Sequence, residues 1–235
     1  MEDYLTQALS QAAELVSRAV PCTQLCRLAG DWCSSPAAFS VAAHRGEAPE
    51  TVAKDLAAHI DVTDSWFDRV TVTGGYLNFR LSHRWYSAVA AEPVVPGPAW
   101  RQSVPPIPVF PAAIHSGDWR FLCRSGRNHR TPEAQLAARQ DQGNPAWLVR
   151  YTGRRLSGLA ERERGERPEG WSETDRRLLR SVAEYPGRSV GSAPALSHYL
   201  TGLAQQLWKT RDSAPTVQKI CAGVLTAGYQ QLAEM

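Results

Sequence analysis

No stretch of this sequence approaches the roughly 18 consecutive apolar residues that a membrane-spanning helix requires. The N-terminal residues are acidic and amphipathic, and they lack the basic start and apolar run of a secretory signal peptide. With 235 residues, of which 43% are hydrophobic, the chain is long enough for two modest domains or one large domain. We therefore expect a globular, cytoplasmic protein without a membrane partner.

Cysteine is scarce and irregularly spaced. Three of the five cysteines, Cys22, Cys26 and Cys33, lie close together, whereas Cys123 and Cys221 are isolated. This spacing fits no common zinc-binding pattern, and a chain of this length rarely depends on a disulfide framework. We expect reduced, buried thiols, with no metal ion and no other cofactor.

Lysine is almost absent, since only three of the 26 basic residues are lysines. Arginine suits bidentate contacts with phosphate and stacking on bases, although an arginine-rich composition also arises from a GC-rich genome. Residues 1–100 carry 7 basic and 11 acidic side chains, whereas residues 101–235 carry 19 and 12. The second part of the chain is therefore the candidate for binding a polyanion.

The N-terminal part predicts a small α+β domain, which we place at residues 1–91. Residues 4–18 have the apolar periodicity of a helix, and a second helix is predicted after Pro49. In residues 69–81, apolar and polar side chains alternate on either side of Gly74-Gly75. This pattern is typical of a β-hairpin with a two-residue turn.

Prolines separate this domain from the rest of the chain. Residues 92–111 contain seven prolines, which neither a helix nor a central strand tolerates. The following stretch has a short apolar patch at Trp119–Cys123 and a polar candidate helix at residues 132–141. We interpret residues 92–143 as a proline-rich linker.

Residues 144–235 predict an all-α helical bundle, so the overall fold class is α+β. Ser172 and Asp175 have the spacing of a capping box, at the start of a helix that must end before Pro186. Apolar residues at helical spacing in 196–207 and 217–232 predict two further helices.

Residues 144–159, NPAWLVRYTGRRLSGL, carry the most chemical information. Asn144-Pro145 is a typical helix start. On a helix, one face collects the apolar residues Leu148, Val149, Thr152, Leu156 and Leu159, and the opposite face collects Trp147, Arg150, Tyr151 and Arg154.

An exposed face of arginines and aromatic rings suits nucleic acid, because guanidinium groups contact phosphates and flat rings stack on unpaired bases. The alternative is that Trp147 and Tyr151 pack against a neighbouring helix. The arginines are then solvated or paired with the acidic residues Glu161, Glu163 and Glu166.

Three stretches resemble parts of arginyl-tRNA synthetases. Residues 30–86, with Gly30-Asp31 and the Gly75-x-x-Asn78-Phe79 pattern, resemble the N-terminal additional domain of that family. Residues 144–159 are similar to the segment with which these enzymes enter their anticodon-binding domain, and residues 172–235 resemble the DALR-type anticodon-binding bundle. The order of the three stretches is that of the family.

The part that carries synthetase catalysis in this family, a Rossmann-type nucleotide-binding domain, has no equivalent in the sequence. Only 57 residues separate Tyr86 from Asn144, too few for several βαβ units of about 30 residues each. His115–Asp118 superficially resembles the first class I motif, but an aspartate replaces the second histidine, and no Lys-Met-Ser-Lys-Ser loop occurs. We interpret His115 as a loop histidine and expect no catalytic residues.

The resemblance implies that the N-terminal domain contacts the elbow of tRNA and that the bundle contacts the anticodon arm. The elbow candidates are Ser35, Tyr76, Asn78 and Phe79. The candidates on the bundle are Trp147, Arg150, Tyr151, Arg154, Arg155, Tyr199, Trp208 and Met235. Phe79, Tyr199 and Trp208 are also compatible with core positions. The DALR tetrapeptide is reduced to Pro194–Ser197 without its arginine, so specificity for arginine tRNA does not follow.

The leading hypothesis is a non-catalytic pseudo-synthetase that binds tRNA, with arginine tRNA as one candidate, and presents it to a partner such as a tRNA-modifying enzyme. The alternative is a protein-interaction module that no longer binds tRNA, which the acidic N-terminal half favours. A third hypothesis, a hydrolase or transferase using Cys33 or Cys123, has no nucleophile and base spacing to support it.

Overall fold

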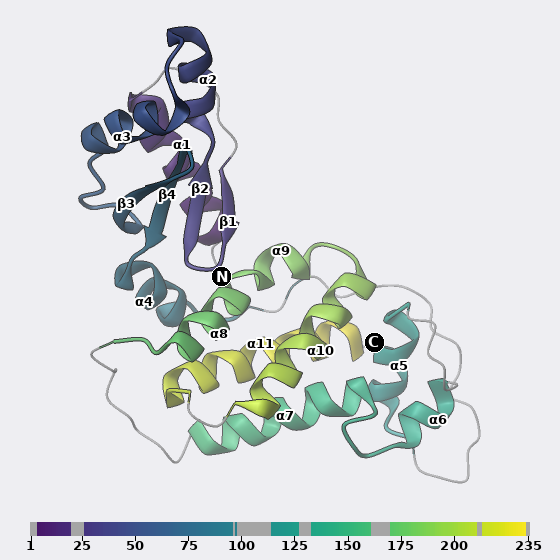
Figure 1. Ribbon diagram of the computed structural model, residues 1–235. Helices are drawn as coiled ribbons and strands as arrows, with labels where there is room; N and C mark the ends of the chain where they lie inside the picture. Colours follow the sequence, from purple (N-terminus) through teal and green to yellow (C-terminus); the bar gives the residue numbers. More distant parts are fainter. Residues whose placement is uncertain are drawn as a thin grey trace. The chain divides into compact units, whose positions relative to one another are not determined.

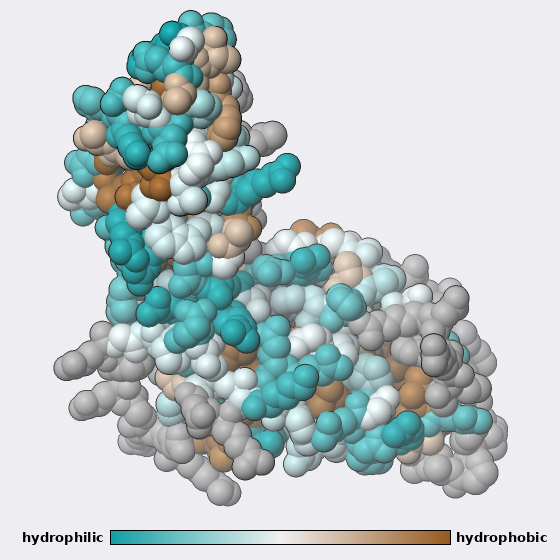
Figure 2. All heavy atoms as spheres, viewed as in Figure 1, coloured by the Kyte–Doolittle hydropathy of each residue, from teal (hydrophilic) through white to brown (hydrophobic). Residues whose placement is uncertain are grey.

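The computed structural model describes residues 4–19, 26–95, 97, 114–126, 133–160, 170–210 and 213–233. The chain divides into two compact units, an N-terminal unit that ends at Ala91 and a helical unit that begins at Glu92 (Figure 1). The predicted α+β fold class is confirmed. On the face shown in Figure 2, hydrophilic side chains cover most of the described surface, and hydrophobic ones form small separate patches.

The N-terminal unit combines helices with an antiparallel sheet. The helices are α1 (Tyr4–Ala19), α2 (Ala37–Arg45), α3 (Pro49–His59) and α4 (His83–Ala91). The strands are β1 (Arg27–Ala29), β2 (Trp32–Ser35), β3 (Phe67–Thr73) and β4 (Tyr76–Leu81), in the order β1-β2-β4-β3. The predicted hairpin is confirmed: Gly74 and Gly75 join β3 to β4 with φ of 55° and 85°, the positive values that a two-residue turn requires.

Alternation along β2 and β4 gives the sheet one buried face. Leu77, Phe79 and Leu81 of β4 are buried, and Cys33 beside Phe79 on β2 is buried with them. The fully buried Trp85 of α4 donates its Nε1 hydrogen to the Tyr4 carbonyl oxygen at 3.1 Å, which ties α4 to α1. The short strands β1 and β2 had no sequence pattern long enough to predict them.

The helical unit contains the bundle expected from the sequence. Its helices are α5 (Ser116–Arg124), α6 (Glu133–Ala138), α7 (Pro145–Ala160), α8 (Glu173–Ala183), α9 (Tyr185–Ser189), α10 (Ala193–Lys209) and α11 (Pro215–Ala233). The capping box is present: Ser172 Oγ accepts from the Asp175 amide at 3.1 Å, and the Asp175 carboxylate accepts from the Ser172 amide. The helices α7, α10 and α11 pack against one another.

Two of these helices approach each other especially closely at Gly228 of α11. A Cβ atom at this position would lie 2.6 Å from Leu200 Cδ2, and the side chain of Leu200 is fully buried between α10 and α11. Any side chain at this position would therefore force Leu200 or one of the two helices to shift.

The helices α5 and α6 lie in the stretch that we interpreted from sequence as a linker. α5 packs against α7, α10 and α11, and its Phe121 and Leu122 are buried. The apolar patch Trp119–Cys123 that we noted in the sequence belongs to this helix. The helical core therefore begins before Asn144, and the proline-rich residues 98–111 lie outside the described part of the chain.

Candidate functional site

The start and the buried face of α7 position the candidate side chains of the helical unit. The buried Asn144 accepts hydrogen bonds at Oδ1 from the amides of Ala146 (3.0 Å) and Trp147 (3.1 Å), which confirms the predicted cap. The apolar face is confirmed for Leu148, Val149, Thr152 and Leu156, which are all buried. The prediction for Leu159 is wrong, since this side chain is 38% exposed.

Three aromatic rings of α7 and α10, which we call the aromatic cluster, lie together at the surface of the helical unit. Trp147 and Tyr151 stack with 4.6 Å between ring centroids and 12° between planes. The Trp208 ring lies 5.8 Å from that of Tyr151 and 6.3 Å from that of Trp147. Tyr151 is 41% exposed, and the two tryptophans are half-buried. The rings therefore pack on a neighbouring helix and still reach the surface.

A cation and a cavity adjoin this cluster. The guanidinium carbon of Arg155 lies 5.9 Å from the centroid of the Trp208 ring, in a cation–π contact. Arg155 and Trp208 also line a cavity of about 340 Å³, together with apolar and amide side chains such as Leu156 and Gln218. Lys209, next to Trp208, is exposed. A flat ring, an exposed cation and an open cavity can together accept a planar group that carries negative charge.

Arg150 lies differently from what the sequence suggested. Its Nε and Nη2 donate to the two carboxylate oxygens of Asp118 at 2.9 and 3.0 Å. Only 12% of the Arg150 side chain and 1% of the Asp118 side chain are exposed. The Tyr229 hydroxyl also donates to Asp118, at 2.7 Å. The hydrogen bond to Asp118 raises the pKa of Arg150, so Arg150 keeps its charge, and the contact joins α5 to α7.

The other candidates of the helical unit have separate positions. Arg154 is exposed on α7 and lines a different cavity from Arg155. Tyr199 is half-buried and donates its hydroxyl hydrogen to the Ser181 carbonyl oxygen at 2.7 Å, so this group serves the contact between α10 and α8. Met235 lies outside the described residues.

In the N-terminal unit, the elbow candidates divide between core and surface. Ser35 and Phe79 are fully buried, because both point to the covered face of the sheet, so neither is available to a surface ligand. Tyr76 is 45% exposed, and its ring contacts that of Phe39 edge-on with 5.0 Å between centroids. Asn78 is half-buried and accepts a hydrogen bond from Ser34 Oγ at 2.6 Å.

Sequence reasoning missed the outer face of this sheet. Trp32 of β2 and Arg80 of β4 are cross-strand partners, and both are partly exposed, as is Asn78 two residues before Arg80. The guanidinium of the exposed Arg69 of β3 lies 5.5 Å from the Trp32 ring centroid. Alternation along β2, with buried Cys33 and partly exposed Trp32, was the only available pattern, and four residues are too few to recognise it.

The cysteines show no sign of a metal or disulfide site in the described residues. Cys26, Cys33, Cys123 and Cys221 are free thiols. Cys33 and Cys221 are buried as expected, whereas Cys26 and Cys123 are partly exposed. Across the described ranges, no group of three or more His, Cys, Asp or Glu side chains is placed to hold a metal ion. Cys22 lies outside those ranges.

Comparison with known proteins gives one result that bears on the N-terminal unit. No curated protein and no solved structure matches the chain. Among the described helices, none has the length and apolar character needed to cross a bilayer. Residues 2–81 match the family model of the arginyl tRNA synthetase N terminal domain, a range that reaches from α1 to β4. The N-terminal unit is therefore an arginyl-tRNA synthetase-like N-terminal domain.

Proposed function

We propose that this protein binds tRNA without aminoacylating it, and that each unit contributes an RNA-contacting surface. The observation that carries the proposal is the aromatic cluster with Arg155 beside a cavity, in a chain whose N-terminal unit is synthetase-like. The basic balance of residues 101–235 supports it, because a polyanion is attracted to such a surface.

On the helical unit, the cluster offers ring faces and edges to an unpaired base. Trp208 borders the cavity, where a base can stack against it, while Arg155 leaves the ring to contact a phosphate. Base stacking on an aromatic ring contributes roughly 1–3 kcal/mol for each base. Unpaired bases occur in the loops of tRNA, and we assign this surface to the anticodon arm.

On the N-terminal unit, we assign the tRNA elbow to the exposed side chains around Tyr76. Phe39 and Tyr76 present adjoining rings, and Asn78 presents an amide on the same strand as Tyr76. Ser35 and Phe79 do not contact tRNA in this proposal, because they are buried in the core of the unit, where they stabilise the strands that carry this surface.

Catalysis of aminoacylation is not part of the proposal. Of the residues between Tyr86 and Asn144, the described ones contain the end of α4, α5 and α6 and no strand. A nucleotide-binding domain of the Rossmann type is built on a parallel sheet. We therefore expect no arginine-dependent exchange of pyrophosphate into ATP, and we propose that the bound tRNA is passed to a partner enzyme.

Replacing Trp208 by leucine, or Tyr151 by leucine, is expected to weaken binding of a 17-nucleotide anticodon stem-loop by about five- to hundredfold. The leucine keeps apolar contact with the neighbouring helix but removes the ring on which a base stacks. Fluorescence anisotropy with the full chain, at several salt concentrations, measures this change.

Arg155→Gln should weaken the same complex and flatten its salt dependence, by about one unit in the slope of log K against log salt concentration. Arg177→Gln is the matched control, because Arg177 is an exposed arginine of α8 outside the cluster and its cavity. Affinities equal to wild type in all three site variants would reject this surface. They would favour the protein-interaction alternative if the protein also co-purifies with protein and without RNA.

A further inference from the structure

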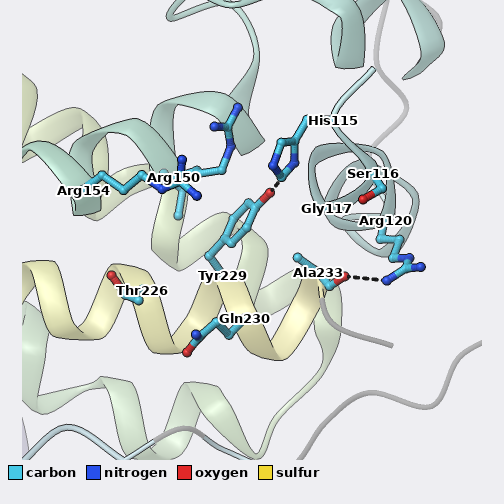
Figure 3. A pocket seen from close by; sticks show the side chains of 11 residues that line it. His115, Ser116, Gly117, Arg120, Arg150, Arg154, Thr226, Tyr229, Gln230 and Ala233 are labelled. Atoms are coloured by element: carbon cyan, nitrogen blue, oxygen red, sulfur yellow. Dashed lines mark hydrogen bonds between the residues drawn. The ribbon is translucent and has the colours of Figure 1, made fainter. Parts of the chain in front are cut away.

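A second cavity of the helical unit, about 330 Å³ in volume, lies among α5, α7 and α11 (Figure 3). Arg120 of α5, Arg150 and Arg154 of α7, and Tyr229 of α11 line it. It shares no lining residue with the cavity beside Trp208. This site is therefore separate from the aromatic cluster, and the proposed function does not use it.

The lining of the cavity is cationic. Among the described residues, three arginines and no carboxylate line it; Asp118 is 1% exposed, and its oxygens already accept from Arg150 and Tyr229. Arg120 donates from Nη1 to the Ala233 carbonyl oxygen at 3.2 Å, which leaves its other nitrogens available. Asp118 offsets the charge of one of the three arginines, so the lining of the cavity keeps an excess of positive charge.

Among the described residues, Arg154 has no acidic partner in this cavity. It is exposed, and no hydrogen bond or ion pair joins it to any residue in the described part of the chain. The guanidinium presents five N–H donors in a planar fork that matches phosphate geometry. An anion in the cavity would supply the partner that Arg154 lacks.

Neutral donors complete the site at the start of α5. His115 precedes the helix and makes no side-chain cap, so the first amides of α5 have no side-chain acceptor there. The His115 ring lies 3.3 Å from the Tyr229 hydroxyl, and Figure 3 shows the two side chains pointing toward each other. Burial lowers the pKa of His115, so its ring is neutral near pH 7 and adds no charge.

Gly117 allows this arrangement. A Cβ atom at position 117 would lie 2.5 Å from the Tyr229 hydroxyl oxygen, well inside contact distance. With glycine, the hydroxyl approaches the first turn of α5 and reaches Asp118. The chain thus brings backbone amides and guanidinium groups to one cavity.

We propose that this cavity binds a phosphate group, either of a free mononucleotide or of the RNA backbone. Arginine clusters favour phosphate because each guanidinium donates two parallel hydrogen bonds to it. The volume lies at the lower end of the roughly 300–1,000 Å³ typical of small-ligand sites, which leaves room for part of a sugar or base beside the phosphate. The RNA source rests on the proposed function, whereas the mononucleotide source does not.

The test uses the full chain and three probes: inorganic phosphate, AMP and the 17-nucleotide stem-loop. Arg154→Gln is expected to lower affinity for the probe that occupies the cavity by about tenfold, since one charge-assisted contact is lost. Arg177→Gln should bind every probe like wild type. Arg154 is exposed, and hydrogen exchange of α7 checks that the variant remains folded.

The outcomes separate the two sources and the two proposals. Loss of AMP binding in Arg154→Gln, with unchanged AMP binding in Trp208→Leu, identifies a mononucleotide site. Loss of stem-loop affinity in Arg154→Gln, together with competition by inorganic phosphate, identifies an RNA phosphate. If RNA does not bind but AMP binds through Arg154, the tRNA proposal fails and the cavity proposal stands. If Arg154→Gln matches Arg177→Gln with all three probes, the cavity proposal is overturned.

Discussion

Replacing Arg150 by methionine should lower the free energy of unfolding of the helical unit by about 3–5 kcal/mol. The variant leaves the Asp118 carboxylate, 1% exposed, without its cationic partner. Of its partners among the described residues, the Tyr229 hydroxyl at 2.7 Å and the His115 ring at 3.6 Å would remain, and a buried charge without a counter-ion is costly. The loss should be greatest where α5 meets α7.

Urea unfolding followed by hydrogen exchange of separate peptides measures this loss for the helical unit and leaves the N-terminal unit as an internal reference. The double variant Asp118→Leu/Arg150→Met is the control, because removing both charges is often close to neutral. Recovery of most of the lost stability is the expected result. A loss below about 1 kcal/mol in the single variant would mean that the pair is solvated and that Arg150 is free to act at the surface.

Phe79→Ala should destabilise the N-terminal unit by about 3–5 kcal/mol. The ring is fully buried, and its centroid lies 5.3 Å from that of the buried Phe67 on β3. Truncation leaves a cavity between the sheet and its helices that the surrounding side chains fill only in part. Exchange of the amides of β3 and β4 should accelerate more than exchange in the helical unit.

Tyr76→Ala is the comparison on the same strand, and its effect on unfolding should stay below about 1 kcal/mol because Tyr76 is 45% exposed. The variant with the smaller effect on stability, Tyr76→Ala, should have the larger effect on tRNA binding by the folded protein. Tyr76→Ala should weaken tRNA binding by the folded protein, whereas Phe79→Ala should act through stability. Comparable stability of the two variants would contradict the core position of Phe79.

The sequence predicted those parts of the fold whose determinants are local. The cap at Asn144 and the capping box of Ser172 and Asp175 need only neighbouring residues, and both are present. The hairpin at Gly74-Gly75 depends on a two-residue turn and on alternation over a few residues, and it is also present. The aromatic cluster was predicted in part, since Trp147 and Tyr151 are one helical turn apart.

The parts that sequence did not predict depend on contacts between distant residues. Arg150 looked like a surface cation because its partner, Asp118, lies 32 positions earlier, in a stretch that we interpreted from sequence as a linker. α5 has few apolar residues, and its burial is apparent only once α7 and α11 are in place. Phe39 became part of a candidate surface only because folding places it against Tyr76.

Gly228 of α11 faces Leu200, which lies on α10 about two helical turns before Trp208. Leu200 and Trp208 both lie on α10. A side chain at position 228 that presses on Leu200 is therefore expected to tilt α10 and to move the Trp208 ring away from Tyr151. We expect such a replacement to weaken the base stacking proposed for Trp208, although every aromatic side chain remains present.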